Sequence, residues 1–210
     1  ALLNRNRFDI PAKHVYARFR ENGVNSTWGL QVYDAHIRAF NNYFEGDLSG
    51  KNSFEEFLEA YDSLLDSIRI SGFDKRKSII PVASDYTAID GAHRVAACLY
   101  FREKLDIAKF AIPGDMYDYE FFTRRGMSQD VLDYVALEYC RIRPDSYAAL
   151  VFPSAVGCDE QLESILCDCG EVYYKKTIEL TKNGPLNLIR QVYRAEQWVG
   201  NWSDSFLGAQ

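Results

Sequence analysis

The stretch Asp-Gly-Ala-His-Arg at residues 90–94 decides the fold of this chain, because the hydrophobic pattern changes across it. A strand-like run, residues 86–89, precedes it, and a helix-like run, residues 95–101, follows it. A glycine turn between a strand and a helix lets the backbone approach a ligand closely, and the first helical N–H groups have no partner within the helix. Because the helix dipole adds partial positive charge there, the stretch predicts an anion site with phosphate as its natural occupant.

The side chains of this stretch predict the chemistry of that site. Arg94 can grip phosphate oxygens with its planar fork, and His93 can donate a hydrogen bond. Asp90, at the end of the expected strand, can hold a magnesium ion or accept a hydroxyl proton. Gly91 and Ala92 would contribute the backbone of the phosphate site. The alternative is a core helix whose His93 and Arg94 only form a salt bridge at its start.

These residues resemble the Gly-x-His-Arg-x-x-Ala signature of the ParB/sulfiredoxin superfamily, matched here by Gly91, His93, Arg94 and Ala97. Members of that superfamily bind nucleoside triphosphates with the loop and helix start that carry the signature. They include partition-protein nucleotidases, sulfiredoxins and kinases of free serine. The resemblance implies an α/β (α+β) fold with a ParB/sulfiredoxin-like mixed sheet, ATP and Mg²⁺ as cofactors, and an active-site role for Asp90, which matches the acidic position of the serine kinases.

Two differences from members of the superfamily argue against two of its known activities. Sulfiredoxins carry a cysteine directly before the signature histidine, whereas this chain has Ala92, which argues against sulfinic-acid repair. Chromosome-partition proteins add a helix-turn-helix reader and basic surfaces, whereas this chain has a formal net charge of −6. We therefore expect a kinase of a small hydroxylated acceptor such as a sugar, an acidic sugar or a serine-like metabolite, and no nucleic-acid partner. A nucleotide-gated switch module and a catalytically silent interaction domain are the alternatives.

Further basic residues are candidates for contacts with the substrate and the nucleotide. Arg5, Arg7 and Lys13 can recognise an anionic acceptor, and a solvated helix start explains them equally well. Lys176 can supply a second positive contact to the nucleotide, although adjacent lysines are also typical of a solvated strand edge. His36 lies beside an apolar helical stripe and is expected to be a packing histidine.

The hydrophobic pattern predicts a helical cap over residues 1–73 and a nucleotide-binding core with a strand-helix C-terminal extension over residues 74–210. Asp9 is expected to cap a helix that begins at Ile10, and apolar residues recur at helical spacing from Leu30 to Phe44. The capping box Ser-Phe-Glu-Glu at residues 53–56 starts a third helix. The later part predicts strands over residues 79–82, 86–89, 107–112 and 171–180, and helices after residue 128, around residues 160–165 and over residues 185–200.

The composition is typical of globular proteins that need no disulfide bonds to fold. Hydrophobic residues make up 47% of 210 positions, which can fill a substantial core, and five cysteines cannot form a complete disulfide framework. No apolar run approaches the length of a membrane span, and no secretion signal is recognisable. We expect a soluble, cytoplasmic protein. Because the chain begins with Ala1 rather than methionine, we also expect either a domain excised from a larger multidomain polypeptide or a processed product.

Overall fold

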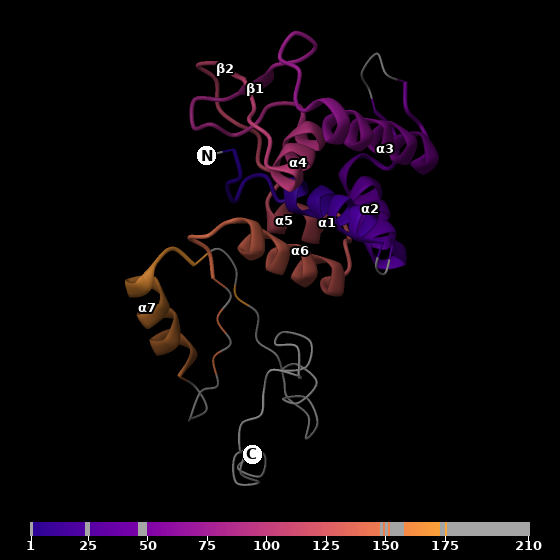
Figure 1. Ribbon diagram of the computed structural model, residues 1–210. Coiled ribbons are helices and arrows are strands. Elements are labelled where there is room, and N and C mark those ends of the chain that lie inside the picture. The colour runs from indigo at the N-terminus through magenta and orange to yellow at the C-terminus, as the bar shows by residue number, and fades with distance from the viewer. Residues whose placement is uncertain are drawn as a thin grey trace. The chain divides into compact units, whose positions relative to one another are not determined.

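The computed structural model describes residues 2–23, 26–45, 50–147, 149, 151, 158–172 and 175. Along this part of the chain the elements are α1 (Asp9–Asn22), α2 (Ser26–Asn41), α3 (Phe54–Ser71), β1 (Ile80–Val82), α4 (Ala92–Phe101), β2 (Ile107–Lys109), α5 (Tyr119–Arg124), α6 (Gln129–Ile142) and α7 (Asp159–Cys169) (Figure 1). The chain separates into two compact units, Ala1–Val156 and Gly157–Gln210. The division expected at residue 73 stays a prediction.

The first unit is rich in helix, and its named strands pair in one small sheet. β1 and β2 run parallel, with Ile80 opposite Ile107 and Val82 opposite Lys109. Figure 1 shows this pair of strands at one end of the unit, next to α4. At a coarse level this is the α+β class that the sequence predicts. Within the described residues the sheet has two parallel strands only, and β2 ends before the expected residue 112.

The strand expected over residues 86–89 is wrong, because the chain turns back directly after β1. Tyr86 lies in the left-handed region with φ 67°, and Ala88 makes only an isolated antiparallel bridge to β1. Asp85 stabilises this turn, since its carboxylate accepts hydrogen bonds from the backbone N–H and the hydroxyl of Thr87, each at 2.9 Å. A local side-chain hydrogen bond therefore replaces the strand ladder that the alternating pattern predicted.

The starts of α3 and α1 differ, because a side chain caps α3 and none caps α1. At α3, the Ser53 hydroxyl accepts a hydrogen bond from the Glu56 backbone N–H at 3.3 Å, and the Glu56 carboxylate accepts one from the Asn52 backbone N–H at 2.8 Å. The Ser53 half of the predicted capping box is confirmed, whereas Glu56 bonds the residue before the N-cap instead of Ser53 itself. At α1, Phe8 is the N-cap and no side chain caps the helix. The expectation that Asp9 caps α1 is wrong, because its carboxylate is engaged by two buried cations.

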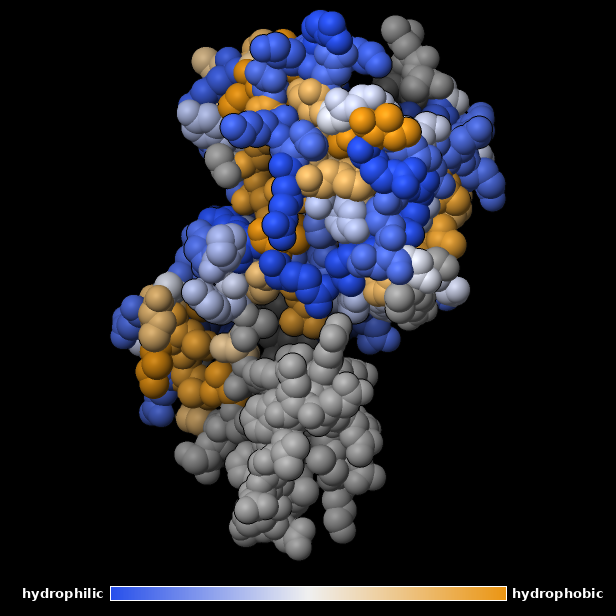
Figure 2. Space-filling model, in the orientation of Figure 1, coloured by the Kyte–Doolittle hydropathy of each residue, from blue (hydrophilic) through white to orange (hydrophobic). Residues whose placement is uncertain are grey.

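α1 is the central helix of the first unit. Its residues 9–17 are all buried, and it contributes Val15, Tyr16 and Ile10 to three different clusters of apolar side chains. These clusters join α1 to α2 and α6, to α3 and α4, and to β1 and α4 respectively. Hydrophilic side chains cover much of the unit's face seen in Figure 2. This enclosed part of α1 has no solvated face for polar residues, so any charge on residues 9–17 needs a partner.

The remaining expectations concern the far end of the chain. α7 confirms the helix expected around residues 160–165. The strand expected over residues 171–180 lies largely outside the described residues, and Lys176 and the final helix over residues 185–200 lie wholly outside them. No helix within the described ranges combines the length and the apolar character that crossing a membrane requires.

Candidate functional site

The candidate site is built on the turn that leads into α4. Gly91 is the N-cap and lies in the left-handed region with φ 84°. A Cβ at this position would lie 2.8 Å from Cδ1 of Ile80 and 2.9 Å from Nη2 of Arg94. The backbone conformation therefore favours glycine here, and an added Cβ would also displace the ends of the Ile80 and Arg94 side chains. No side chain caps the ten-residue helix that follows, so its first N–H groups can bind a ligand.

Asp90 and Arg94 face each other across this turn. Nη2 of Arg94 lies 2.9 Å from Oδ2 of Asp90, and Nη1 of Arg94 donates to the hydroxyl of Ser78. The Asp90 side chain is 74% exposed and that of Arg94 is 26% exposed. The salt bridge considered as an alternative at this helix start is thus present, between Arg94 and Asp90. Because an exposed ion pair contributes little stability, both groups can exchange it for a ligand at low cost.

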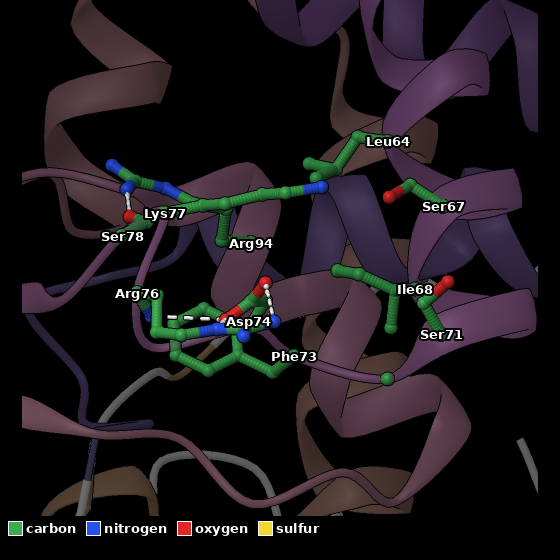
Figure 3. A pocket seen from close by; sticks show the side chains of 11 residues that line it. Leu64, Ser67, Ile68, Ser71, Phe73, Asp74, Arg76, Lys77, Ser78 and Arg94 are labelled. Carbon is green, nitrogen blue, oxygen red and sulfur yellow. Dashed lines mark hydrogen bonds and ion pairs between the residues drawn. The ribbon is translucent and has the colours of Figure 1, made fainter.

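Arg94 also lines a pocket of about 550 Å³ between α3 and the segment that leads to β1 (Figure 3). Its lining consists of Leu64, Ser67, Ile68, Ser71, Gly72, Phe73, Asp74, Arg76, Lys77, Ser78 and Arg94. Asp74 is paired with Arg76 at 3.0 Å, and hydrogen bonds from Arg76 lower the pKa of Asp74 to about 2. Because Arg94 is paired with Asp90, Lys77 is the lining cation for which the described residues show no ion pair, and it gives the pocket a net positive charge. Its volume lies within the range of small-ligand sites.

The His93 side chain contacts α2 and α3, whereas the neighbouring Arg94 side chain lines the pocket. Its Nε2 lies 2.8 Å from the hydroxyl of Tyr33 on α2, and its ring meets the ring of Tyr61 on α3 edge-on, with centroids 4.8 Å apart. Burial, followed by the charges of Lys13 and His36, lowers the pKa of His93 well below 6.5. The ring is therefore neutral at pH 7, and it can act by hydrogen bonding rather than as a cation.

Arg7 and Lys13, two of the predicted substrate-binding residues, lie together around the carboxylate of Asp9. Asp9 was expected to cap a helix and not to belong to the site. Arg7 holds Asp9 by two bonds, Nε–Oδ1 at 2.8 Å and Nη2–Oδ2 at 2.7 Å, and Nζ of Lys13 lies 3.1 Å from Oδ2. Burial alone would raise the pKa of Asp9, but Lys13 and Arg7 outweigh it and hold that pKa well below its usual range. Arg7 and Lys13 are each 3% exposed, which excludes a solvated helix start for them, whereas Arg5 is exposed.

His36 joins the same group of charges. Its Nε2 lies 3.3 Å from Nζ of Lys13, its ring is fully buried, and its Nδ1 has no hydrogen-bond partner within the described residues. Sequence reasoning treated His36 as a packing residue and Asp9 as a helix cap. The available signal was the spacing of Asp9 and Lys13, which are four residues apart in an expected helix and carry opposite charges.

A second buried carboxylate ties α1 to α6. Glu138 is 0% exposed and accepts hydrogen bonds from Nδ1 of His14 at 2.7 Å and from Nε and Nη2 of Arg18 at 3.0 and 2.9 Å. Burial opposes ionisation, but His14 and Arg18 outweigh it and lower the pKa of Glu138 to about 2. This cluster has a structural role, because both carboxylate oxygens of Glu138 already accept hydrogen bonds from the protein itself.

Within the described ranges, His, Cys, Asp and Glu side chains form no group of three or more that could hold a metal ion. The candidate site therefore consists of the Gly91 turn, the Asp90–Arg94 pair and the cationic pocket, with the Asp9–Lys13–His36 cluster on the His93 side of α4. No protein-family model, curated protein or solved structure matches the chain.

Proposed function

We propose that this protein is an ATP- and Mg²⁺-dependent phosphotransferase that acts on a small hydroxylated acceptor such as a sugar, an acidic sugar or a serine-like metabolite. One observation carries the proposal: a left-handed glycine turn presents Arg94 and the exposed carboxylate of Asp90 at the uncapped start of α4. The proposal includes a ParB/sulfiredoxin-like core with a strand-helix extension, a cytoplasmic location and no nucleic-acid partner.

The nucleotide's phosphates would lie at the start of α4. Backbone N–H groups at Gly91 and Ala92 and the helix dipole favour negative charge there, and Arg94 supplies a charge-assisted contact. The neighbouring pocket adds Lys77 and is large enough for part of a nucleotide. Phosphoryl transfer depends mainly on positioning and charge neutralisation, which is what this arrangement supplies. The contact expected from Lys176 stays a prediction.

The donor set suits magnesium better than a metal that needs a full protein cage. Mg²⁺ commonly keeps several waters and takes one or two carboxylates together with substrate phosphates. Asp90 offers one exposed carboxylate beside the proposed phosphate site, so it would be the protein ligand. When bound, the ion would neutralise charge on the transferred phosphoryl group. Asp90 could instead act as a general base, in which case it would accept the proton of the acceptor's hydroxyl group.

Binding tests the proposal first. ATP with Mg²⁺ should raise the melting temperature, because a ligand that binds the folded state stabilises it. Arg94→Ala should weaken ATP binding by about 1.5 to 3 kcal/mol, or roughly tenfold to over a hundredfold. The matched control is Arg69→Ala, which removes an arginine that is 53% exposed and paired with Asp66 on α3. Unchanged ATP affinity in folded Arg94→Ala protein would contradict the proposed phosphate site.

Turnover tests the second half of the proposal. ADP release is measured with free serine, neutral sugars and acidic sugars, each against a reaction without acceptor. We expect at least one acceptor class to accelerate ADP formation. ATP binding without acceleration by any acceptor would instead favour a nucleotide-gated switch module.

A further inference from the structure

Two tyrosines from other helices hold the ring of His93, the second residue of α4. The rings of Tyr33 on α2 and Tyr61 on α3 both pack edge-on against the His93 ring. The Tyr33 hydroxyl lies 2.8 Å from Nε2 of His93, whereas the Tyr61 hydroxyl donates to the backbone carbonyl of Lys13 at 3.2 Å. Tyr33 is therefore the tyrosine that contacts a ring nitrogen of His93, and Tyr61 contacts the ring by packing alone.

The single proton of the Tyr33 hydroxyl has two possible acceptors. Nε2 of His93 lies 2.8 Å from the hydroxyl oxygen, and the backbone carbonyl oxygen of Phe57 lies 3.3 Å from it. Phe57 lies inside α3, where its carbonyl already accepts a helical N–H, whereas Nε2 has no second partner among the described residues. The shorter distance and the greater need of the nitrogen both assign the proton of Tyr33 to the bond with His93.

The acceptor role of Nε2 decides where the His93 ring carries its own proton. Burial lowers the pKa of His93 well below 6.5, and the positive end of the α4 dipole also disfavours a charged ring. A neutral imidazole has one N–H, so with Nε2 as acceptor the proton lies on Nδ1. Because Nδ1 is bonded to the ring carbon that joins Cβ, this N–H stays close to the backbone of the first turn of α4.

Nδ1 of His93 is open to a ligand. No group in the described part of the chain bonds it, yet it is not among the buried atoms left without a partner, so it reaches the surface of the partly exposed side chain. The neighbouring backbone N–H groups of α4 are uncapped. A neutral N–H beside them suits a ligand group that only accepts hydrogen bonds, such as a phosphoryl oxygen.

We propose that Tyr33 is a positioning residue, which holds His93 in the Nδ1–H tautomer so that His93 donates an uncharged hydrogen bond to a phosphoryl oxygen at the start of α4. Arg94 supplies the charged contact at the same helix start, and His93 supplies a contact on the side of α2 and α3. The tautomer does not depend on the proposed function. The assignment of the phosphoryl oxygen to ATP does rest on it.

Histidine NMR of the full chain tests the tautomer without any ligand. The protein is labelled with ¹⁵N-histidine, and its 3 histidine rings are assigned by His14→Gln, His36→Gln and His93→Gln. Long-range ¹H–¹⁵N spectra at pH 7 report which ring nitrogen carries the proton. We expect the proton of His93 on Nδ1. A proton on Nε2 of His93 in the folded parent protein would overturn the proposal.

Two tyrosine variants separate positioning from packing. Tyr33→Phe and Tyr61→Phe each remove one buried hydroxyl and keep the aromatic ring that packs against His93. We expect the Nδ1–H form of His93 to lose its dominance in Tyr33→Phe and to persist in Tyr61→Phe, the matched control. A merely structural role for Tyr33 would leave the tautomer of the folded variant unchanged, and that result overturns the positioning role.

ATP titration in the presence of Mg²⁺ tests the contact with the nucleotide. Tyr33→Phe should weaken ATP binding by about two- to tenfold, the effect of one uncharged hydrogen bond, and Tyr61→Phe should leave it unchanged. If the parent protein binds ATP and Tyr33→Phe binds it equally well, the donor role of His93 is overturned. Failure of the parent protein to bind ATP would overturn the nucleotide assignment together with the proposed function. The His93 spectra decide the tautomer independently, so the two failures are distinguishable.

Discussion

Asp90 is the residue on which the proposed chemistry depends. Asp90→Asn keeps the size of the side chain but removes the charge that would hold magnesium or accept a proton. We expect acceptor-dependent ADP formation to fall by about a hundredfold or more, with a much smaller change in ATP affinity. Stability should change little, because the Asp90 side chain is 74% exposed and its pair with Arg94 is solvated. Equal turnover in the variant and the parent protein would remove Asp90 from the mechanism.

Gly91 can be tested for the geometry of the turn. Gly91→Ala places a methyl group at φ 84° and within 2.8 Å of Ile80, so it should lower the free energy of unfolding by about 1–3 kcal/mol and weaken ATP binding. Gly126→Ala is the matched control, because Gly126 has φ 78° but nothing within 4 Å of the added Cβ. Urea denaturation of both variants separates backbone strain, which they share, from crowding at the α4 turn. Equal destabilisation and full ATP binding would show that the turn tolerates a side chain.

At the scale of elements, the contact between α1 and α6 should depend on pH through Glu138. The pKa of its carboxyl group falls from 4.5 to about 2 on folding, so its stabilising contribution is complete above pH 4.5 and is lost as the pH falls toward 2. Glu138→Gln removes that contribution. We expect the variant to be less stable than the parent by roughly 3 kcal/mol at pH 7, with a difference that narrows as the pH approaches 2.

Urea denaturation at pH 7, 4.5 and 3 measures this difference. Asp145→Asn is the control, because Asp145 pairs with Arg143 at the surface and its side chain is 64% exposed. That variant should stay close to the parent protein throughout. A difference between Glu138→Gln and the parent that does not depend on pH would mean that packing, rather than ionisation, explains the role of Glu138.

At the scale of the whole molecule, charge separates the kinase from a DNA-binding switch. A net charge of −6 should repel duplex DNA, so we expect no saturable binding in a fluorescent-duplex titration at about 0.15 M salt, where screening extends over roughly 8 Å. Local cationic pockets do not change this expectation, because duplex binding usually needs a broad basic surface. Saturable duplex binding that responds to ATP, without acceptor-dependent ADP release, would replace the kinase by a switch module.

Local patterns were sufficient for several elements and for part of the site. The Ser53 cap that starts α3, the helical spacing of apolar residues along α2 and the position of Gly91 before α4 were predicted correctly, because caps, turns and periodicity act over a few neighbouring residues. The prediction of a strand over residues 86–89 was wrong because another interaction between neighbouring residues decided the conformation. Asp85 offers the backbone a competing local bond that the alternation of apolar residues does not reveal.

Tertiary packing alone decided the surroundings of α1. The sequence predicts a helix cap for Asp9 and either an acceptor contact or a solvated position for Lys13, but residues 9–17 of α1 are enclosed by elements from distant parts of the chain. His36, 23 residues beyond Lys13, then becomes its hydrogen-bond partner, and the backbone carbonyl of Ala88, 81 residues beyond Arg7, accepts from the guanidinium group. Burial makes such pairs obligatory, because a charge removed from water must find its partner wherever the fold supplies one.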